Sequence, residues 1–346
     1  MYHPFFGVSK DPFSMTPDPA FLFLTLADRE VLASMTYSIL SRKGVVMLTG
    51  EAGTGKTTLI RRVFQSIPWT RVRFSAVLNP TLTPADFLEL VLLDFGITDV
   101  PASKAQRLIL LQQFLIGECQ EHRVVVLVVD EAHKLPLDVL EEIRLLTNFQ
   151  LATAQQLQVL MAGQTELGDM LNRHDLRQLK QRVAVRLVLH PLSATDVGQY
   201  IQHRWQTAGA SGPHPFQHDV VARIAQCSQG IPRLINALCE NALMQACAKG
   251  QATIGAALID QVVRDLDLLE GPGPSALATP NPPPRAAREA NIPGVNGHLN
   301  GTSNRAEPLL RFRLSKDSDQ SDQPSPVPAT KRIFGDLSPP NPEITR

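Results

Sequence analysis

The chain lacks several features that would place it in a class at once. Its 346 residues include four cysteines and no Cys-x-x-Cys pair, so we expect small buried thiols in a reducing compartment rather than a metal site. Lysine plus arginine and aspartate plus glutamate number 33 each, so no overall field favours nucleic acid or an anionic membrane. No basic region followed by an apolar core opens the chain, and no apolar run approaches the ~20 residues that span a bilayer. We therefore expect neither a signal peptide nor a direct membrane span.

What the sequence does contain is the segment GEAGTGKT at residues 50–57, which fits the P-loop pattern G-x-x-x-x-G-K-[ST]. The apolar run Val45–Leu48 predicts a buried strand before it, and a helix is predicted to follow. Glycines let backbone N–H groups approach phosphates, Lys56 reaches the β- and γ-phosphates, and the Thr57 hydroxyl ligates Mg²⁺. The alternative is a chance glycine-rich turn. The strand–loop–helix setting favours a nucleoside triphosphate site, with ATP and Mg²⁺ as expected cofactors.

A second β-branched run, Val124–Val129, ends in two carboxylates. Such a run is typical of a central strand in a parallel sheet, and ligands bind at the carboxyl ends of these strands. Asp130 is placed to hold the Mg²⁺ shell, and Glu131 is the candidate to orient and deprotonate the attacking water. An acidic pair that caps the next helix is the alternative. The letters D-E-A-H also occur in helicases, but none of the other helicase motifs is present, so His133 is interpreted as structural.

Three further polar residues are candidates for contacts with the γ-phosphate. Gln164 ends a strand-like run from Leu157, and either senses the phosphate or forms a simple strand-end turn. Arg182, with Arg177 as second choice, precedes another strand-like run and is expected to reach a neighbouring subunit's nucleotide; a solvated basic helix face is the alternative. Arg233 lies in the first turn of a helix that Pro232 begins, where it either reaches the phosphate from a lid or is an ordinary helix-terminal arginine.

Composition divides the chain into four predicted parts. Residues 1–42, rich in aromatics and prolines, are expected to wrap an adjoining domain and to end in a helix. Residues 43–190 alternate strand-like and helical patterns, which predicts an α/β domain with a parallel sheet flanked by helices. Residues 191–270 predict an all-α lid. Residues 271–346 hold 14 of the 27 prolines and predict a disordered tail, whose apolar islands at 309–314 and 331–334 either dock on a partner or cluster by chance.

The order of these features resembles that of AAA+ ATPases of the P-loop class. Several phrases resemble, more narrowly, the general secretion pathway protein A (ExeA-like) ATPases over roughly residues 1–270. These phrases include Phe5-Phe6-Gly7, Thr16-Pro17-Asp18-Pro19, Arg144-Leu145-Leu146-Thr147-Asn148 and Gly230-Ile231-Pro232-Arg233-Leu234-Ile235-Asn236. By position, the resemblance implies that the nucleotide residues are Gly50, Glu51, Ala52, Gly53, Thr54, Gly55, Lys56, Thr57, Thr58, Asp130, Glu131, Gln164, Arg182 and Arg233.

The chain departs from that family in three places. His133 and Lys134 stand where relatives often have Gln and Asn, and Asp28 stands where a histidine is expected, which puts adenine-side contacts there in doubt. The full-length secretion ATPases continue into a transmembrane helix and a peptidoglycan-binding module, and neither is expected here. Any coupling to the envelope is therefore expected to pass through a partner.

The leading hypothesis is an AAA+ ATPase that self-assembles with nucleotide and assists assembly of an envelope machine of the type II secretion or pilus/exopolysaccharide type. It would be cytoplasmic, or peripheral at the inner membrane through an inner-membrane or envelope partner. The alternative is a DNA-associated ATPase of the transposition-helper type, against which the balanced charge and the lack of a DNA-binding motif argue. A scaffold that binds ATP without turning it over is a third hypothesis, which Glu131 disfavours.

Overall fold

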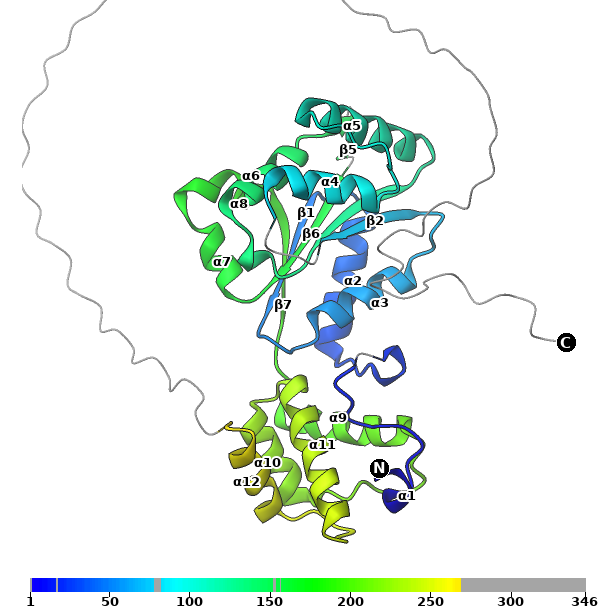
Figure 1. The fold of residues 1–346 in the computed structure, drawn as a ribbon, viewed down its shortest axis with the longest axis vertical. Helices are drawn as coiled ribbons and strands as arrows, with labels where there is room; N and C mark the ends of the chain where they lie inside the picture. Colours follow the sequence, from blue (N-terminus) through cyan, green and yellow to red (C-terminus); the bar gives the residue numbers. More distant parts are fainter. Residues whose placement is uncertain (1, 17, 78–81, 152–153, 156, 269–346) are drawn as a thin grey trace, which may run out of the picture. The chain divides into compact units, whose positions relative to one another are not determined.

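The computed structural model describes residues 2–16, 18–77, 82–151, 154–155 and 157–268, and a five-stranded parallel sheet forms the core of its α/β part (Figure 1). The strands run in the order β2-β3-β6-β1-β7, and their bounds are β1 Val45–Gly50, β2 Val72–Val77, β3 Val124–Val129, β6 Leu157–Gly163 and β7 Val183–Leu189. A separate antiparallel pair consists of β4 (Gln150–Leu151) and β5 (Ala154–Gln155). The predicted disordered tail, residues 271–346, and its apolar islands lie outside the described residues.

Helices cover both faces of this sheet, as alternate side chains of each buried strand require. One face packs against α2 (Leu26–Leu40) and α3 (Lys56–Ser66). The other face packs against α4 (Pro84–Asp94), α5 (Lys104–Gln120), α6 (Leu137–Leu146), α7 (Glu166–Leu171) and α8 (Arg177–Arg182). The 3₁₀ helices η2 (Ala132–Lys134) and η3 (His174–Leu176) connect elements on this side. The predicted α/β class with a parallel sheet flanked by helices is confirmed.

Four helices after β7 form the predicted all-α lid. They are α9 (Ala194–Thr207), α10 (His218–Ser228), α11 (Pro232–Ala248) and α12 (Ala256–Asp265). The expected capping box starts α9: Ser193 Oγ accepts from the Asp196 backbone N–H, and an Asp196 carboxylate oxygen accepts from the Ser193 N–H. Pro232 is the first residue of α11, as its missing N–H permits.

The N-terminal segment, with α1 (His3–Phe6) and η1 (Pro19–Phe21), adds side chains to the lid core. Tyr2, Phe13 and Phe21 are buried in the same apolar cluster as the lid helices. By contrast, Met35 and Ile39 of α2 are buried against the sheet. The first 42 residues are thus shared between two cores, and the exact domain boundaries stay a prediction.

Three of the four cysteines are less buried than the sequence predicts. Cys239 is fully buried, as expected, but Cys119, Cys227 and Cys247 are only half-buried. Within the described ranges, no group of three or more His, Cys, Asp or Glu side chains is arranged to hold a metal ion. The described part of the chain also contains no helix with the length and hydropathy needed to cross a bilayer.

Gly230 joins α10 to α11 in a conformation that disfavours side chains. Its φ is +74°, and a Cβ atom there would lie 2.0 Å from the Leu192 carbonyl oxygen, while the Gly230 carbonyl accepts from the Leu192 N–H at 2.9 Å. We expect Gly230→Ala to lower the free energy of unfolding by at least about 3 kcal/mol, since left-handed strain and a backbone clash add. Gly250→Ala is the control, because φ there is +66° with nothing within 4 Å of the added atom, and it should cost only about 1 kcal/mol. Equal losses in urea unfolding would contradict this account of Gly230.

Candidate functional site

The P-loop joins the end of β1 to the start of α3. Gly53 and Gly55 have φ of +83° and +102°, which glycine adopts without strain. Lys56 is 6% exposed, and its ammonium donates to the carbonyl oxygens of Gly50 at 2.9 Å and Glu51 at 2.8 Å. Burial lowers the pKa of Lys56, although nearby carboxylates, Glu131 first among them, oppose that shift. The loop therefore holds one buried positive charge at the N-terminus of a helix, where anions bind.

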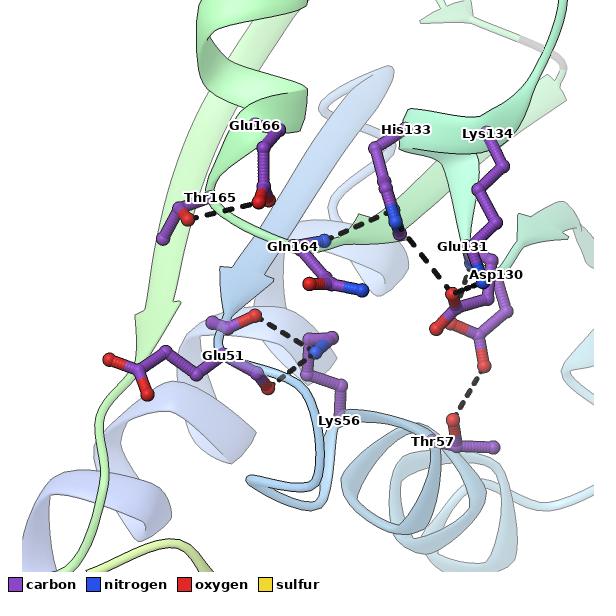
Figure 2. Close-up of polar contacts among 11 residues, drawn as sticks. Glu51, Lys56, Thr57, Asp130, Glu131, His133, Lys134, Gln164, Thr165 and Glu166 are labelled. Carbon is purple, nitrogen blue, oxygen red and sulfur yellow. Dashed lines mark hydrogen bonds and ion pairs between the residues drawn. The ribbon is translucent and has the colours of Figure 1, made fainter. Parts of the chain in front are cut away.

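Asp130 lies opposite α3, directly after β3. The Thr57 hydroxyl donates to Asp130 Oδ2 at 2.5 Å, and Asp130 Oδ1 accepts from the Glu131 backbone N–H at 2.9 Å. Asp130 is only 7% exposed. The structure thus brings together the two residues that the sequence predicts as Mg²⁺ ligands (Figure 2).

Glu131 occupies the left-handed region, with φ +52° and ψ +32°, an uncommon conformation for this residue type. Its carboxylate accepts from Lys134 Nζ at 2.7 Å and lies 3.8 Å from His133 Nε2. Burial raises the pKa of this carboxyl group, but the hydrogen bond and charge of Lys134, with help from His133 and Lys56, outweigh that effect and lower it. Glu131 is therefore ionised at neutral pH, as a general base requires.

Gln164 follows β6, between the strands that carry the P-loop and Asp130. Its backbone N–H donates to His133 Nδ1 at 3.2 Å, so a neutral His133 carries its proton on Nε2, the nitrogen nearer Glu131. Figure 2 shows this edge of the sheet with Lys56, Glu131 and Gln164 side chains around a common space. The structural role predicted for His133 agrees with this contact.

A cavity of about 390 Å³ opens beside these residues. It is lined by P-loop residues from Ala52 through Leu59, by Glu131 and Gln164, and by Arg233 of the lid. The Arg233 N–H donates to the Gly53 carbonyl at 3.3 Å, and a Cβ on Gly53 would meet that arginine's side chain at 2.8 Å. The start of α11 thus sits directly against the P-loop.

Part of this cavity was not identified from the sequence. Arg204 of α9 lines it, donates through Nε to the Pro12 carbonyl at 2.5 Å, and places its guanidinium 4.9 Å from the centre of the Phe21 ring. Tyr200 also lines it and donates its hydroxyl proton to Asn236 Oδ1 at 2.8 Å. No sequence pattern could link Arg204 to Pro12, because the two are 192 positions apart.

Arg182 lies elsewhere. In the part of the chain that the structure describes, the residues lining the cavity include neither Arg182 nor Arg177. Arg182 instead ends α8 and donates to Asn148 Oδ1 at 2.5 Å and to the Thr147 carbonyl at 3.3 Å. An arginine that serves a neighbouring subunit would lie outside its own cavity, and that role stays a prediction.

Residues 39–171 match the AAA_22 family, described as an AAA domain. The chain is 40% identical over 255 residues to General secretion pathway protein A of Aeromonas hydrophila, which covers 73% of this chain and 46% of that protein. It therefore spans less than half the length of this relative. The resemblance predicted from the sequence is confirmed.

Two other similarities are more distant. ATP-dependent target DNA activator B of Escherichia phage Mu is 26% identical over 260 residues, covering 73% of this chain and 75% of that protein. The crystal structure of Cdc6p from Pyrobaculum aerophilum superposes with a TM-score of 0.58 at 16% identity, covering 75% of this chain and 71% of that one. At that identity the likeness concerns the fold alone, and it agrees with the P-loop α/β architecture and helical lid.

Proposed function

We propose that this chain binds and hydrolyses ATP, because residues 39–171 match an AAA domain and the chain is 40% identical to General secretion pathway protein A over 255 residues. The observation that carries the proposal is the meeting of three strand ends at one edge of the sheet. Lys56 follows β1, the Asp130–Glu131 pair follows β3, and Gln164 follows β6. A buried cation, a hydroxyl–carboxylate pair and an ionised general base are the parts that phosphoryl transfer to water needs.

The residues present fit Mg²⁺. Thr57 and Asp130 supply two hard oxygen donors 2.5 Å apart at the N-terminus of α3. Mg²⁺ is usually held by one or two protein oxygens together with phosphate oxygens and water, so two protein donors suffice. When bound there, the ion would neutralise charge on the phosphates. Thr57 and Asp130 are the residues that would hold it.

The remaining residues take distinct roles in this proposal. Lys56 and the amides of Gly50–Thr58 hold the phosphates, and Glu131 orients water and accepts its proton. Gln164 and Arg233 contact the γ-phosphate from the sheet and from the lid. Arg182 of a neighbouring subunit stabilises charge on the transferred group, which makes the active form a homo-oligomer.

The kinship with General secretion pathway protein A supports a role in assembling an envelope machine of the type II secretion or pilus/exopolysaccharide type. Such work would be done at the cytoplasmic side, through an inner-membrane or envelope protein that the ATPase engages. The matched region covers 46% of that relative. The action of this chain on a partner protein is therefore proposed for this chain and is not taken over from that relative.

A second function is favoured by one observation, the similarity to ATP-dependent target DNA activator B over 75% of that protein. This supports a DNA-associated ATPase of the transposition-helper type. The 33 positive and 33 negative side chains argue against it, since non-specific DNA binding depends on a basic surface.

The first experiment measures ATP turnover across a protein concentration series, with and without duplex DNA, for the wild type and Arg182→Ala. We expect the rate per subunit to rise with concentration and the variant to lose about 10³-fold or more. A rate that is flat with concentration and unaffected by the variant would contradict a shared site. Strong stimulation by DNA that disappears steeply with added salt would favour the second function.

A further inference from the structure

Two contacts fix the guanidinium of Arg182 at the C-terminal end of α6. One acceptor is the Thr147 carbonyl, on a fully buried residue whose own N–H donates to the Ile143 carbonyl at 3.1 Å. The other acceptor is the side-chain oxygen of Asn148, at 2.5 Å, which is the shorter contact. Both residues belong to the phrase Arg144–Asn148, to which the proposed reaction assigns no role.

Apolar packing sets where the base of the Arg182 side chain lies. Ile143 and Leu146 of α6 and Leu179 of α8 are fully buried in one cluster, so the two helices are held against each other. Beyond that packing, Arg182 is only half-buried and has several rotatable bonds. An arginine side chain loses rotamer entropy when it is fixed, so partners that hold it in advance reduce the entropy that is lost during the reaction.

The helix whose C-terminal end holds Arg182 is α6, and it starts near the edge of the sheet at which Glu131 lies. α6 begins at Leu137, shortly after Glu131. A plain surface hydrogen bond is the alternative interpretation. The charged donor and the second acceptor, a buried carbonyl, distinguish this contact from an isolated surface pair.

We propose that Asn148 is a positioning residue for Arg182: it holds the guanidinium in the orientation in which this group reaches a neighbouring subunit's nucleotide. The inference rests on the proposed function, because it needs Arg182 to act between subunits. Asn148 touches no substrate in this scheme and acts only through the arginine.

Asn148→Ala should lower turnover per subunit by about 10- to 100-fold, since small misplacement of a catalytic group has effects of this size. The Kd for ATP and the melting temperature should stay close to the wild-type values. Asn172→Ala is the matched control, because Asn172 Oδ1 likewise accepts from a cation of α8, Lys180 Nζ, at 2.6 Å. It removes the same kind of contact from the same helix and should leave turnover within about twofold.

Mixing experiments at a concentration that supports assembly test the shared site and the role of Asn148 separately. Subunits with Glu131→Gln keep Asn148 and Arg182, so they should restore turnover to both Arg182→Ala subunits and Asn148→Ala subunits. A mixture of Asn148→Ala with Arg182→Ala should turn over ATP no faster than Asn148→Ala alone, because neither subunit presents a correctly held arginine.

Each failure has its own signature. No restoration of Arg182→Ala by Glu131→Gln would overturn the shared site, and the Asn148 assignment with it. Restoration there, together with a mixture of Asn148→Ala and Arg182→Ala that turns over ATP faster than Asn148→Ala alone, would overturn only the assignment of Asn148, since that residue would then act on its own subunit's site. Full activity of Asn148→Ala alone would overturn it as well.

Discussion

Replacing Glu131 with glutamine should lower ATP turnover by about 10²- to 10⁴-fold while leaving ATP bound. The amide keeps the size of the carboxylate but cannot accept the proton of the attacking water. The left-handed backbone at this residue accommodates glutamine no worse than glutamate, so the fold should persist. Single-turnover hydrolysis of radiolabelled ATP measures the rate. Size-exclusion chromatography shows whether the variant stays oligomeric with ATP bound.

Glu141→Gln is the control for that substitution. Glu141 is also a carboxylate with a lowered pKa, in this case chiefly through its hydrogen bond from Arg144, but it lies on α6 away from the cavity. Its turnover should match the wild type. Rapid hydrolysis by the Glu131 variant would remove this residue from the role of general base.

The second large effect is expected at the P-loop, where Lys56→Met should weaken ATP binding by about 10²-fold or more. Methionine keeps most of the side-chain volume but removes the only positive charge that the loop itself holds against the Gly50 and Glu51 carbonyls. Charge-assisted hydrogen bonds to phosphate are each worth about 1.5–3 kcal/mol, which corresponds to this loss. Isothermal titration calorimetry measures the change in Kd.

Lys134→Met provides the contrast. Lys134 also lines the cavity, but its side chain is half exposed and its ammonium donates to the Glu131 carboxylate at 2.7 Å. Its effect on the Kd for ATP should be much smaller than that of Lys56→Met, and equal effects would contradict the special position of Lys56.

Because burial lowers the pKa of Lys56, the wild type's affinity should also begin to fall at a lower pH than titration of an exposed lysine would give.

The parts that sequence could predict share one physical property, local pattern. The P-loop is contiguous, and its glycines and lysine must follow one another for the backbone to fold around phosphate. The run Val124–Val129 is buried on both faces, so it is uniformly apolar and reveals a central strand. Ser193 and Asp196 form a capping box within one helical turn. Each prediction needed only neighbours in the chain.

The parts that sequence could not predict depend on tertiary contact. Asn148 and Arg182 meet because α6 and α8 pack together, and nothing in either segment alone indicates the other. A family resemblance could mark Arg144–Asn148 as a shared phrase but could not say what it contacts.

The N-terminal segment is attached to the lid, so we expect the two to open together in local unfolding. Tyr2, buried in the lid core, donates its hydroxyl proton to Glu240 of α11 at 2.7 Å, and Arg204 of α9 binds the Pro12 carbonyl. In amide hydrogen exchange, residues 2–13 and helices α9–α12 should therefore lose protection together, as one cooperative unit assembled from the two ends of the described chain. Docking the N-terminal segment on the lid requires closure of a loop as long as the whole sheet domain, so this docking should be a late step in folding.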